Sequence, residues 1–134
     1  MVTPGPRIGS RVLFVGDDVS VGDACARSLR LEGYEVWGAL SGREGLALAQ
    51  RHLPDAIIID LRRPLASSLD LVGSIRGIQG LEHTPVAVVA NTPLADAELR
   101  DRAAALGVSL HFRPVWLREL VELARQLAHL SLVR

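Results

Sequence analysis

Five short apolar runs, each followed by a longer amphipathic segment, divide the chain of 134 residues. The most informative run is residues 56–59, in which apolar residues with no polar alternation end at a single carboxylate, Asp60. Such a run is typical of a strand that helices cover on both faces, as in a parallel sheet. We therefore expect a buried central strand with Asp60 at its carboxyl end.

The same pattern predicts four further strands and five helices. Strands are predicted over residues 11–16, 34–38, 85–90 and 108–112, and helices over 20–31, 42–51, 69–78, 94–106 and 117–128. Ser41 and Glu44 form a capping box before the second helix, and Thr92 with Pro93 is expected to begin the fourth. Residues 65–68 are predicted to be a loop.

A strand followed by a helix, five times over, indicates parallel strands with right-handed crossovers and helices on both faces of the sheet. We therefore predict an α/β domain over residues 11–134, preceded by a disordered segment over residues 1–10.

Composition narrows the function classes. Fifteen basic residues balance fifteen acidic ones, so net charge does not favour nucleic acid or an anionic membrane as a partner. No apolar run approaches the roughly 20 residues that span a bilayer, and the N-terminus lacks the apolar segment of a signal peptide, so we expect a cytoplasmic protein. The single Cys25 excludes an internal disulfide and is expected to be a small buried residue on a helix. The four histidines show no metal-ligand spacing.

Carboxylates follow two of the predicted strands. Asp17 and Asp18 come after the first strand, and Asp60 ends the third. Ligands of parallel sheets bind beyond the carboxyl ends of the strands, where Asp17 and Asp60 converge if the two strands are neighbours. Two carboxylates about 4 Å apart repel by about 4 kcal/mol at an effective dielectric near 20, so the pair requires a proton, a cation or a metal ion. Oxygen ligands completed by water indicate magnesium, and a carboxylate beside it can attack phosphorus. The residues alone equally allow Asp17 and Asp18 to cap a helix while Asp60 starts a turn.

The chain resembles the receiver domain of two-component response regulators over residues 11–130. The resemblance lies in the apolar run 12–15 that leads into acids, in residues 31–36 and 54–64, and in the prolines Pro85 and Pro114. It implies a three-layer, flavodoxin-like (βα)5 fold, a doubly wound parallel five-stranded sheet with strand order 2-1-3-4-5. It also implies that Asp60 accepts a phosphoryl group from a sensor histidine kinase or a phosphotransfer protein, and that Mg²⁺ is bound by Asp17, Asp60 and the backbone carbonyl of Arg62.

One departure from the family lies among the metal ligands. The family usually has two adjacent acids after the first strand, and this chain has Gly16 at the first position and Asp17 at the second. Asp18 falls one place later, where it is at most an additional ligand. The pocket therefore lacks one charge that would help to hold magnesium.

Three more departures lie at the ends of later strands. Ala90 occupies the usual serine or threonine position, followed by Asn91, so the hydroxyl that binds the transferred phosphoryl group is missing. Arg113 occupies the usual lysine position, and its planar fork can pair permanently with Asp60. Leu110 stands where an aromatic switch residue is common.

The resulting expectation is a stand-alone receiver domain that signals through phosphorylation of Asp60. It would be no enzyme beyond its own autophosphorylation and autodephosphorylation. The alternative is a degenerate pseudo-receiver that acts as a phosphorylation-independent protein–protein interaction module. A small flavodoxin-like enzyme is less well supported, because the sequence has no glycine-rich phosphate loop, nucleophile elbow or paired catalytic histidine.

The expected output is contact with a downstream protein, because the chain ends after the fifth helix without a DNA-binding domain. Family resemblance places this contact on the face formed by the fourth helix, fifth strand and fifth helix, which can also support a homodimer. Trp116 and Leu132 are candidate exposed apolar residues near that face.

Overall fold

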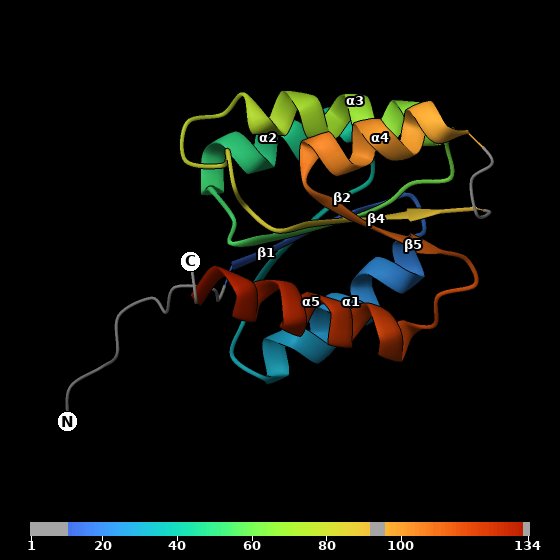
Figure 1. The fold of residues 1–134 in the computed structure, drawn as a ribbon. Coiled ribbons are helices and arrows are strands. Elements are labelled where there is room, and N and C mark those ends of the chain that lie inside the picture. The colour runs from blue at the N-terminus through green and yellow to red at the C-terminus, as the bar shows by residue number, and fades with distance from the viewer. Residues whose placement is uncertain (1–10, 92–95, 133–134) are drawn as a thin grey trace.

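The computed structural model describes residues 11–91 and 96–132. The predicted disordered segment 1–10 and the predicted helix start at Thr92 and Pro93 lie outside these residues. Five parallel strands form one sheet in the order β2-β1-β3-β4-β5, which confirms the expected strand order (Figure 1). The strands are β1 (Arg11–Gly16), β2 (Glu35–Ala39), β3 (Ala56–Asp60), β4 (Val86–Ala90) and β5 (Val108–Phe112).

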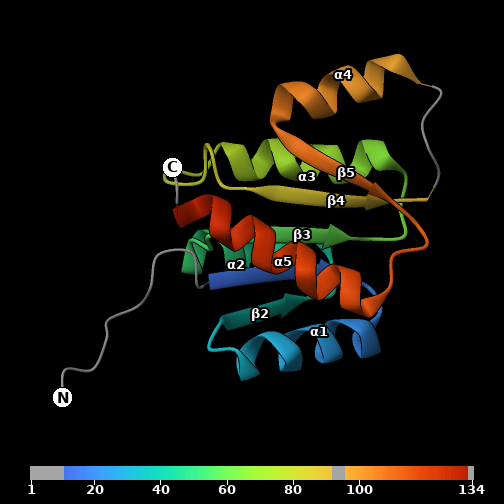
Figure 2. The ribbon, with the colours of Figure 1, turned by 60° about the horizontal axis from the view of Figure 1, so that its bottom comes forward.

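Five helices complete the three layers. They are α1 (Val19–Leu31), α2 (Gly42–His52), α3 (Leu65–Arg76), α4 (Ala97–Leu106) and α5 (Leu117–Leu132). Helices α1 and α5 cover one face of the sheet, and α2, α3 and α4 cover the other (Figures 1 and 2). Among the described residues, no helix combines the length and the apolar character needed to cross a bilayer.

Side chains of the central strands alternate between two apolar layers, as the period of a strand requires. From β1 and β3, Val12, Phe14, Ala56 and Ile58 pack with residues of α1 and α5, whereas Leu13, Val15, Ile57 and Ile59 pack with residues of α2, α3 and α4. The three isoleucines of β3 are 0% exposed. Burial on both faces explains why β3 has no polar alternation.

The register of the sheet positions the candidate site. Strand β1 pairs in parallel with β3 so that Gly16 lies opposite Asp60. Asp17, the residue after Gly16, therefore leaves β1 at the level of Asp60. The prediction that Asp17 and Asp60 converge required β1 and β3 to be neighbours, and the two strands are paired directly.

Two helix starts differ from the prediction. Helix α3 begins at Leu65 rather than Leu69, so residues 65–68 belong to the helix and are not a loop. The buried side chains of Leu65 and Ser68 extend the apolar stripe of α3 by one turn, which accounts for the earlier start. The described part of α4 begins at Ala97, and its N-cap is Asp96, whose carboxylate accepts hydrogen bonds from the backbone N–H groups of residues 98 and 99.

Arg76 at the end of α3 joins three segments of backbone. Its guanidinium donates to the carbonyl oxygens of Leu81 (3.0 Å), Thr84 (2.6 Å) and Leu106 (3.0 Å). Leu81 and Thr84 are each 1% exposed, so these carbonyls have little access to water. Arg76 thus fixes the end of α4 against the connection that leads into β4.

Candidate functional site

Asp60 ends β3 with its side chain 17% exposed, and it pairs with Arg113. The Nη2 of Arg113 donates to Oδ1 of Asp60 at 2.5 Å, and the arginine side chain is 19% exposed. Oδ2 of Asp60 accepts no hydrogen bond from the residues that the structure describes. One oxygen of this carboxylate is therefore held, and the other faces the cavity.

The backbone places Arg113 against Asp60. Arg113 follows β5, and its N–H donates to the carbonyl oxygen of Ala90 at 2.8 Å, which extends the pairing of β4 with β5 by one residue. The second arm of its guanidinium, Nη1, donates to Oδ1 of Asn91 at 2.7 Å. Arg113 therefore bridges the end of β3 and the end of β4 with one planar fork, a geometry that a lysine cannot provide.

Asp17 lies at the same edge but has a different partner. Its Oδ2 accepts a hydrogen bond from the backbone N–H of Arg62 at 3.0 Å, which ties the end of β1 to the chain that leaves β3. Asp18 is the N-cap of α1, because its Oδ1 accepts from the backbone N–H of Val21 at 3.2 Å. The helix-cap alternative is thus correct for Asp18, whereas Asp17 is directed to the Asp60 region.

A cavity of about 390 Å³ brings the predicted residues together. It is lined by Asp17, Asp18, Val21, Asp60, Arg62, Val89, Arg113, Pro114, Val115 and Trp116. The convergence of two carboxylates beside a guanidinium is the arrangement that the sequence suggests.

The remaining predicted positions are not among the residues that line this cavity, and they contribute no functional group to it. Gly16 lies beside Asp60 in the register of the sheet and offers no side chain. Ala90 is buried, 7% exposed, and ends β4 with a methyl group in place of a hydroxyl. Leu110 packs against the apolar layer of α2, α3 and α4. The polar group at the end of β4 is the side-chain amide of Asn91, held by Arg113.

Comparison with known proteins gives the family. The model of the response regulator receiver domain matches residues 12–123. The chain belongs to this family. The receiver domain is 35% identical over 114 residues to the transcriptional regulatory protein PrrA of Mycobacterium tuberculosis, covering 83% of this chain and 46% of that protein. It is 30% identical over 113 residues to PdtaR of the same species, covering 83% of this chain and 53% of that one. The chain thus spans about half the length of the curated relatives it matches.

Solved structures agree with this assignment. The chemotaxis protein CheY4 of Vibrio cholerae superimposes with a TM-score of 0.73 at 27% identity, over 88% of this chain and 98% of that one. The non-phosphorylated receiver domain of HemR from Leptospira biflexa gives a TM-score of 0.70 at 26% identity, over 88% and 93%. The expected flavodoxin-like fold is therefore confirmed.

The donor atoms of this receiver domain are of the type that magnesium prefers. Asp17 and Asp60 supply carboxylate oxygens, and the Arg62 backbone lies next to Asp17. Within residues 11–91 and 96–132, no group of three or more histidine, cysteine or acidic side chains is placed to hold a metal ion. A site with two carboxylates fits magnesium, which commonly keeps several waters, but it has fewer charges than the family pattern.

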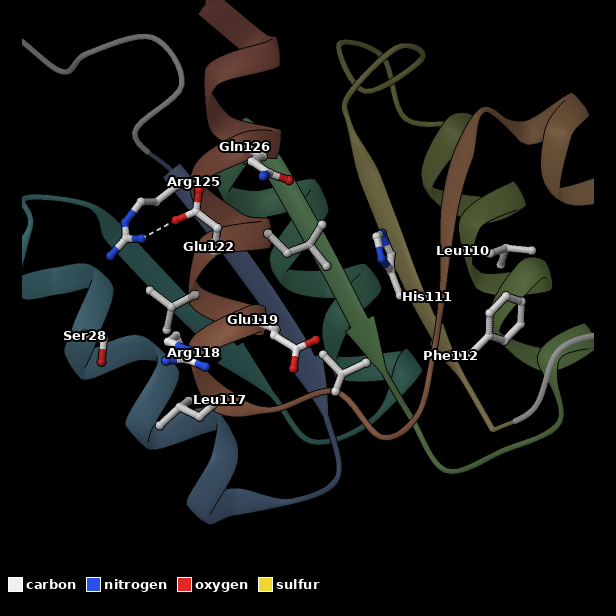
Figure 3. A pocket seen from close by; sticks show the side chains of 13 residues that line it. Ser28, Leu110, His111, Phe112, Leu117, Arg118, Glu119, Glu122, Arg125 and Gln126 are labelled. Atoms are coloured by element: carbon white, nitrogen blue, oxygen red, sulfur yellow. Dashed lines mark hydrogen bonds and ion pairs between the residues drawn. The ribbon is translucent and has the colours of Figure 1, made fainter.

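A second hollow, a groove of about 1130 Å³, lies between β5 and α5 (Figure 3). His111 points into the groove, whereas Leu110 and Phe112 point to the opposite face of β5 (Figure 3). Burial lowers the pKa of His111. Arg125 on α5 pairs with Glu122 and with Glu32 of α1. The groove between β5 and α5 thus lies on part of the face that was predicted to contact a downstream protein.

The apolar candidates for that face are both exposed, but they differ in position. Trp116 is 66% exposed and Leu132 is 55% exposed. Trp116 lines the Asp60 cavity and not the groove. The position of Trp116 beside the carboxylates could not be predicted from the spacing of apolar residues, because it depends on the turn at Pro114. The contact of Asn91 with Arg113 was also not predicted from the sequence. The sequence feature that could have indicated it is an amide side chain directly after an apolar strand.

Proposed function

We propose that this receiver domain accepts a phosphoryl group on Asp60 and signals by the change in charge that follows. The observation that carries the proposal is the cavity in which Asp60 and Asp17 meet beside Arg113 at the carboxyl edge of the sheet. Oδ2 of Asp60 attacks the phosphorus of a phosphohistidine, a new P–O bond forms, and the P–N bond breaks with the imidazole as leaving group. The donor would be a sensor histidine kinase or a phosphotransfer protein.

Asp17, Asp60 and the backbone carbonyl of Arg62 would hold Mg²⁺. When bound, this ion neutralises charge on the phosphoryl oxygens during transfer. Arg113 supplies a guanidinium cation that donates directly to Asp60. The backbone N–H of Arg62 orients Asp17.

Phosphorylation adds about 1.5 to 2 negative charges at Asp60. Arg113 then has a stronger acceptor than the side-chain amide oxygen of Asn91, so its Nη1 exchanges Asn91 for a phosphoryl oxygen. Freed Asn91 changes the end of β4, and the movement of Arg113 changes the start of the turn into α5. This route would replace the usual hydroxyl and aromatic pair, which Ala90 and Leu110 do not provide.

The rest of the proposal concerns context. The chain would act in the cytoplasm without turning over a separate substrate, and its only chemistry would be phosphorylation and dephosphorylation of Asp60. The signal would pass to a downstream protein through the face that contains the groove between β5 and α5. The same face can support a homodimer, and no direct contact with nucleic acid is proposed.

The test is incubation with acetyl phosphate and Mg²⁺, followed by intact-mass measurement. We expect the mass of one phosphoryl group to be added to the wild type and to Asp101→Asn, an exposed acid on α4, but not to Asp60→Ala. Addition to Asp60→Ala, or no addition to the wild type, would contradict the proposal. The second outcome would favour a phosphorylation-independent docking module, for which the existing Asp60–Arg113 pair is the specific structural argument.

A further inference from the structure

The ring of Phe14 fills the space beside Gly16. Phe14 lies on β1, two residues before Gly16, and is 2% exposed among residues of α1 and α5. Because side chains two apart on a strand share a face, a side chain at position 16 would point toward the same layer as Phe14. Position 16 is also the direct neighbour of Asp60 in the sheet. A side chain there would lie beside Asp60 on the face of the sheet that α1 and α5 cover.

That space is not available in this chain. A Cβ atom at position 16 would lie 2.6 Å from Cε1 and 3.3 Å from Cζ of Phe14, and 3.4 Å from the carbonyl oxygen of Asp60. The first distance is well below carbon–carbon contact distance. The ring is rigid and has a second neighbour at Gly22 of α1, where a Cβ would lie 3.6 Å from its Cδ1. Phe14 therefore lies between two glycines, with its ring in close contact with the space at position 16 and at ordinary contact distance from the space at position 22.

We infer that Phe14 excludes a third acid from the metal site, because its ring takes the volume that an acidic side chain at position 16 would need. The inference rests on the proposed function only in that the metal is the cofactor proposed there. The number of acids in the pocket is therefore limited to two by the packing of Phe14, and not only by the glycine at position 16. Arg113, paired with Asp60, supplies positive charge in the pocket independently of a metal ion.

This reasoning predicts how Phe14 and Gly16 depend on each other. Gly16→Asp alone places a carboxylate against a buried ring, so it lowers the melting temperature and leaves the magnesium affinity unchanged. Phe14→Val with Gly16→Asp opens the space and adds a third carboxylate. We expect the magnesium dissociation constant to fall at least about tenfold, which corresponds to about 1.4 kcal/mol. Phe14→Val alone opens the space without adding a ligand, so its affinity stays at the wild-type value.

The experiment measures Mg²⁺ binding by isothermal titration calorimetry and melting by circular dichroism for the four proteins of this double-mutant cycle. Strong coupling, with tighter binding only in the double variant, is the expected result. Additive effects, or tight binding by Gly16→Asp with Phe14 intact, would overturn the inference. If Gly16→Asp does not fold, Gly16→Ala replaces it in a melting-temperature cycle, because the clash begins at Cβ. A smaller loss from Gly16→Ala in the Phe14→Val background is then expected, and an equal loss overturns the inference.

These readouts are independent of phosphorylation. If acetyl phosphate fails to modify Asp60 while the cycle shows coupling, the proposed function fails and the inference about Phe14 stands. If Asp60 is modified while the cycle is additive, the reverse holds.

Discussion

The sharpest prediction concerns Arg113→Gln, which removes the cation beside Asp60 but keeps a polar side chain of similar length. The variant loses a charged hydrogen bond to Asp60 with the donor and acceptor 19% and 17% exposed, so solvent screens it only partly. Such a bond contributes about 1.5–3 kcal/mol, and the bond to Asn91 adds up to about 1 kcal/mol. Loss of the cation also leaves Asp60 and Asp17 to repel each other without compensation. We expect the free energy of unfolding to fall by about 2–4 kcal/mol in the absence of magnesium.

Magnesium makes this prediction specific to the site. Under the proposed function Asp60 would bind both Mg²⁺ and the guanidinium. The ion should therefore stabilise Arg113→Gln by more than it stabilises the wild type. The assay is urea unfolding followed by circular dichroism, with and without MgCl₂. Arg63→Gln, an exposed arginine after β3, serves as the control and should change stability by less than about 0.5 kcal/mol. A loss below about 1 kcal/mol for Arg113→Gln, or an equal magnesium effect on both proteins, would refute the reasoning.

Three further predictions test the packing of side chains outside the Asp60 cavity. Arg76→Ala removes a guanidinium donor from three backbone carbonyls, one of which, that of Leu81, keeps a longer hydrogen bond from the N–H of Thr84. The variant should lower the free energy of unfolding by about 3 kcal/mol in urea unfolding, and a loss below about 1 kcal/mol would show that water replaces the guanidinium. Burial raises the pKa of Cys25 to about 11, so the thiol should react with a thiol reagent only after denaturation; rapid reaction of the native protein would be inconsistent with its packing. Burial lowers the pKa of His111 below its ordinary value of 6.5. As the pH falls through 6.5, the unfolded chain therefore takes up a proton at His111 before the folded chain does. The free energy of unfolding declines from that pH down to the lower pKa of the folded state. His111→Gln should show a smaller decline in melting temperature between pH 7.5 and 5.5, and an unchanged decline would exclude His111 as its source.

The sheet could be predicted because its signals are local. Each apolar run became a strand within about one residue of its predicted bounds, and the alternation of strand and helix left a parallel order as the natural arrangement. The convergence of Asp17 and Asp60 followed from strand neighbourhood alone. The start of α3 was missed because Ser67 and Ser68 resemble a loop by composition, whereas burial of Ser68 and Leu65 carries the helix back to Pro64.

The contacts that define this site could not be predicted, because they are made between segments distant in sequence. The fork of Arg113 reaches both Asp60 and Asn91 only because β4 and β5 pair through to the residue after β5. The ring of Phe14 reaches the space of Gly16 through a rotamer that the sequence does not specify. Residue identity therefore showed which family groups were absent, and the structure shows what occupies their places.

The central claim is that Asp60 itself carries the phosphoryl group. Reduction of an acyl phosphate with borohydride converts the aspartate to homoserine, which peptide mass spectrometry assigns to one position. After treatment with acetyl phosphate and Mg²⁺, the account predicts homoserine at position 60 and an unmodified peptide that contains Asp17 and Asp18. Homoserine at position 17 or 18, or none anywhere in the treated protein, would contradict it.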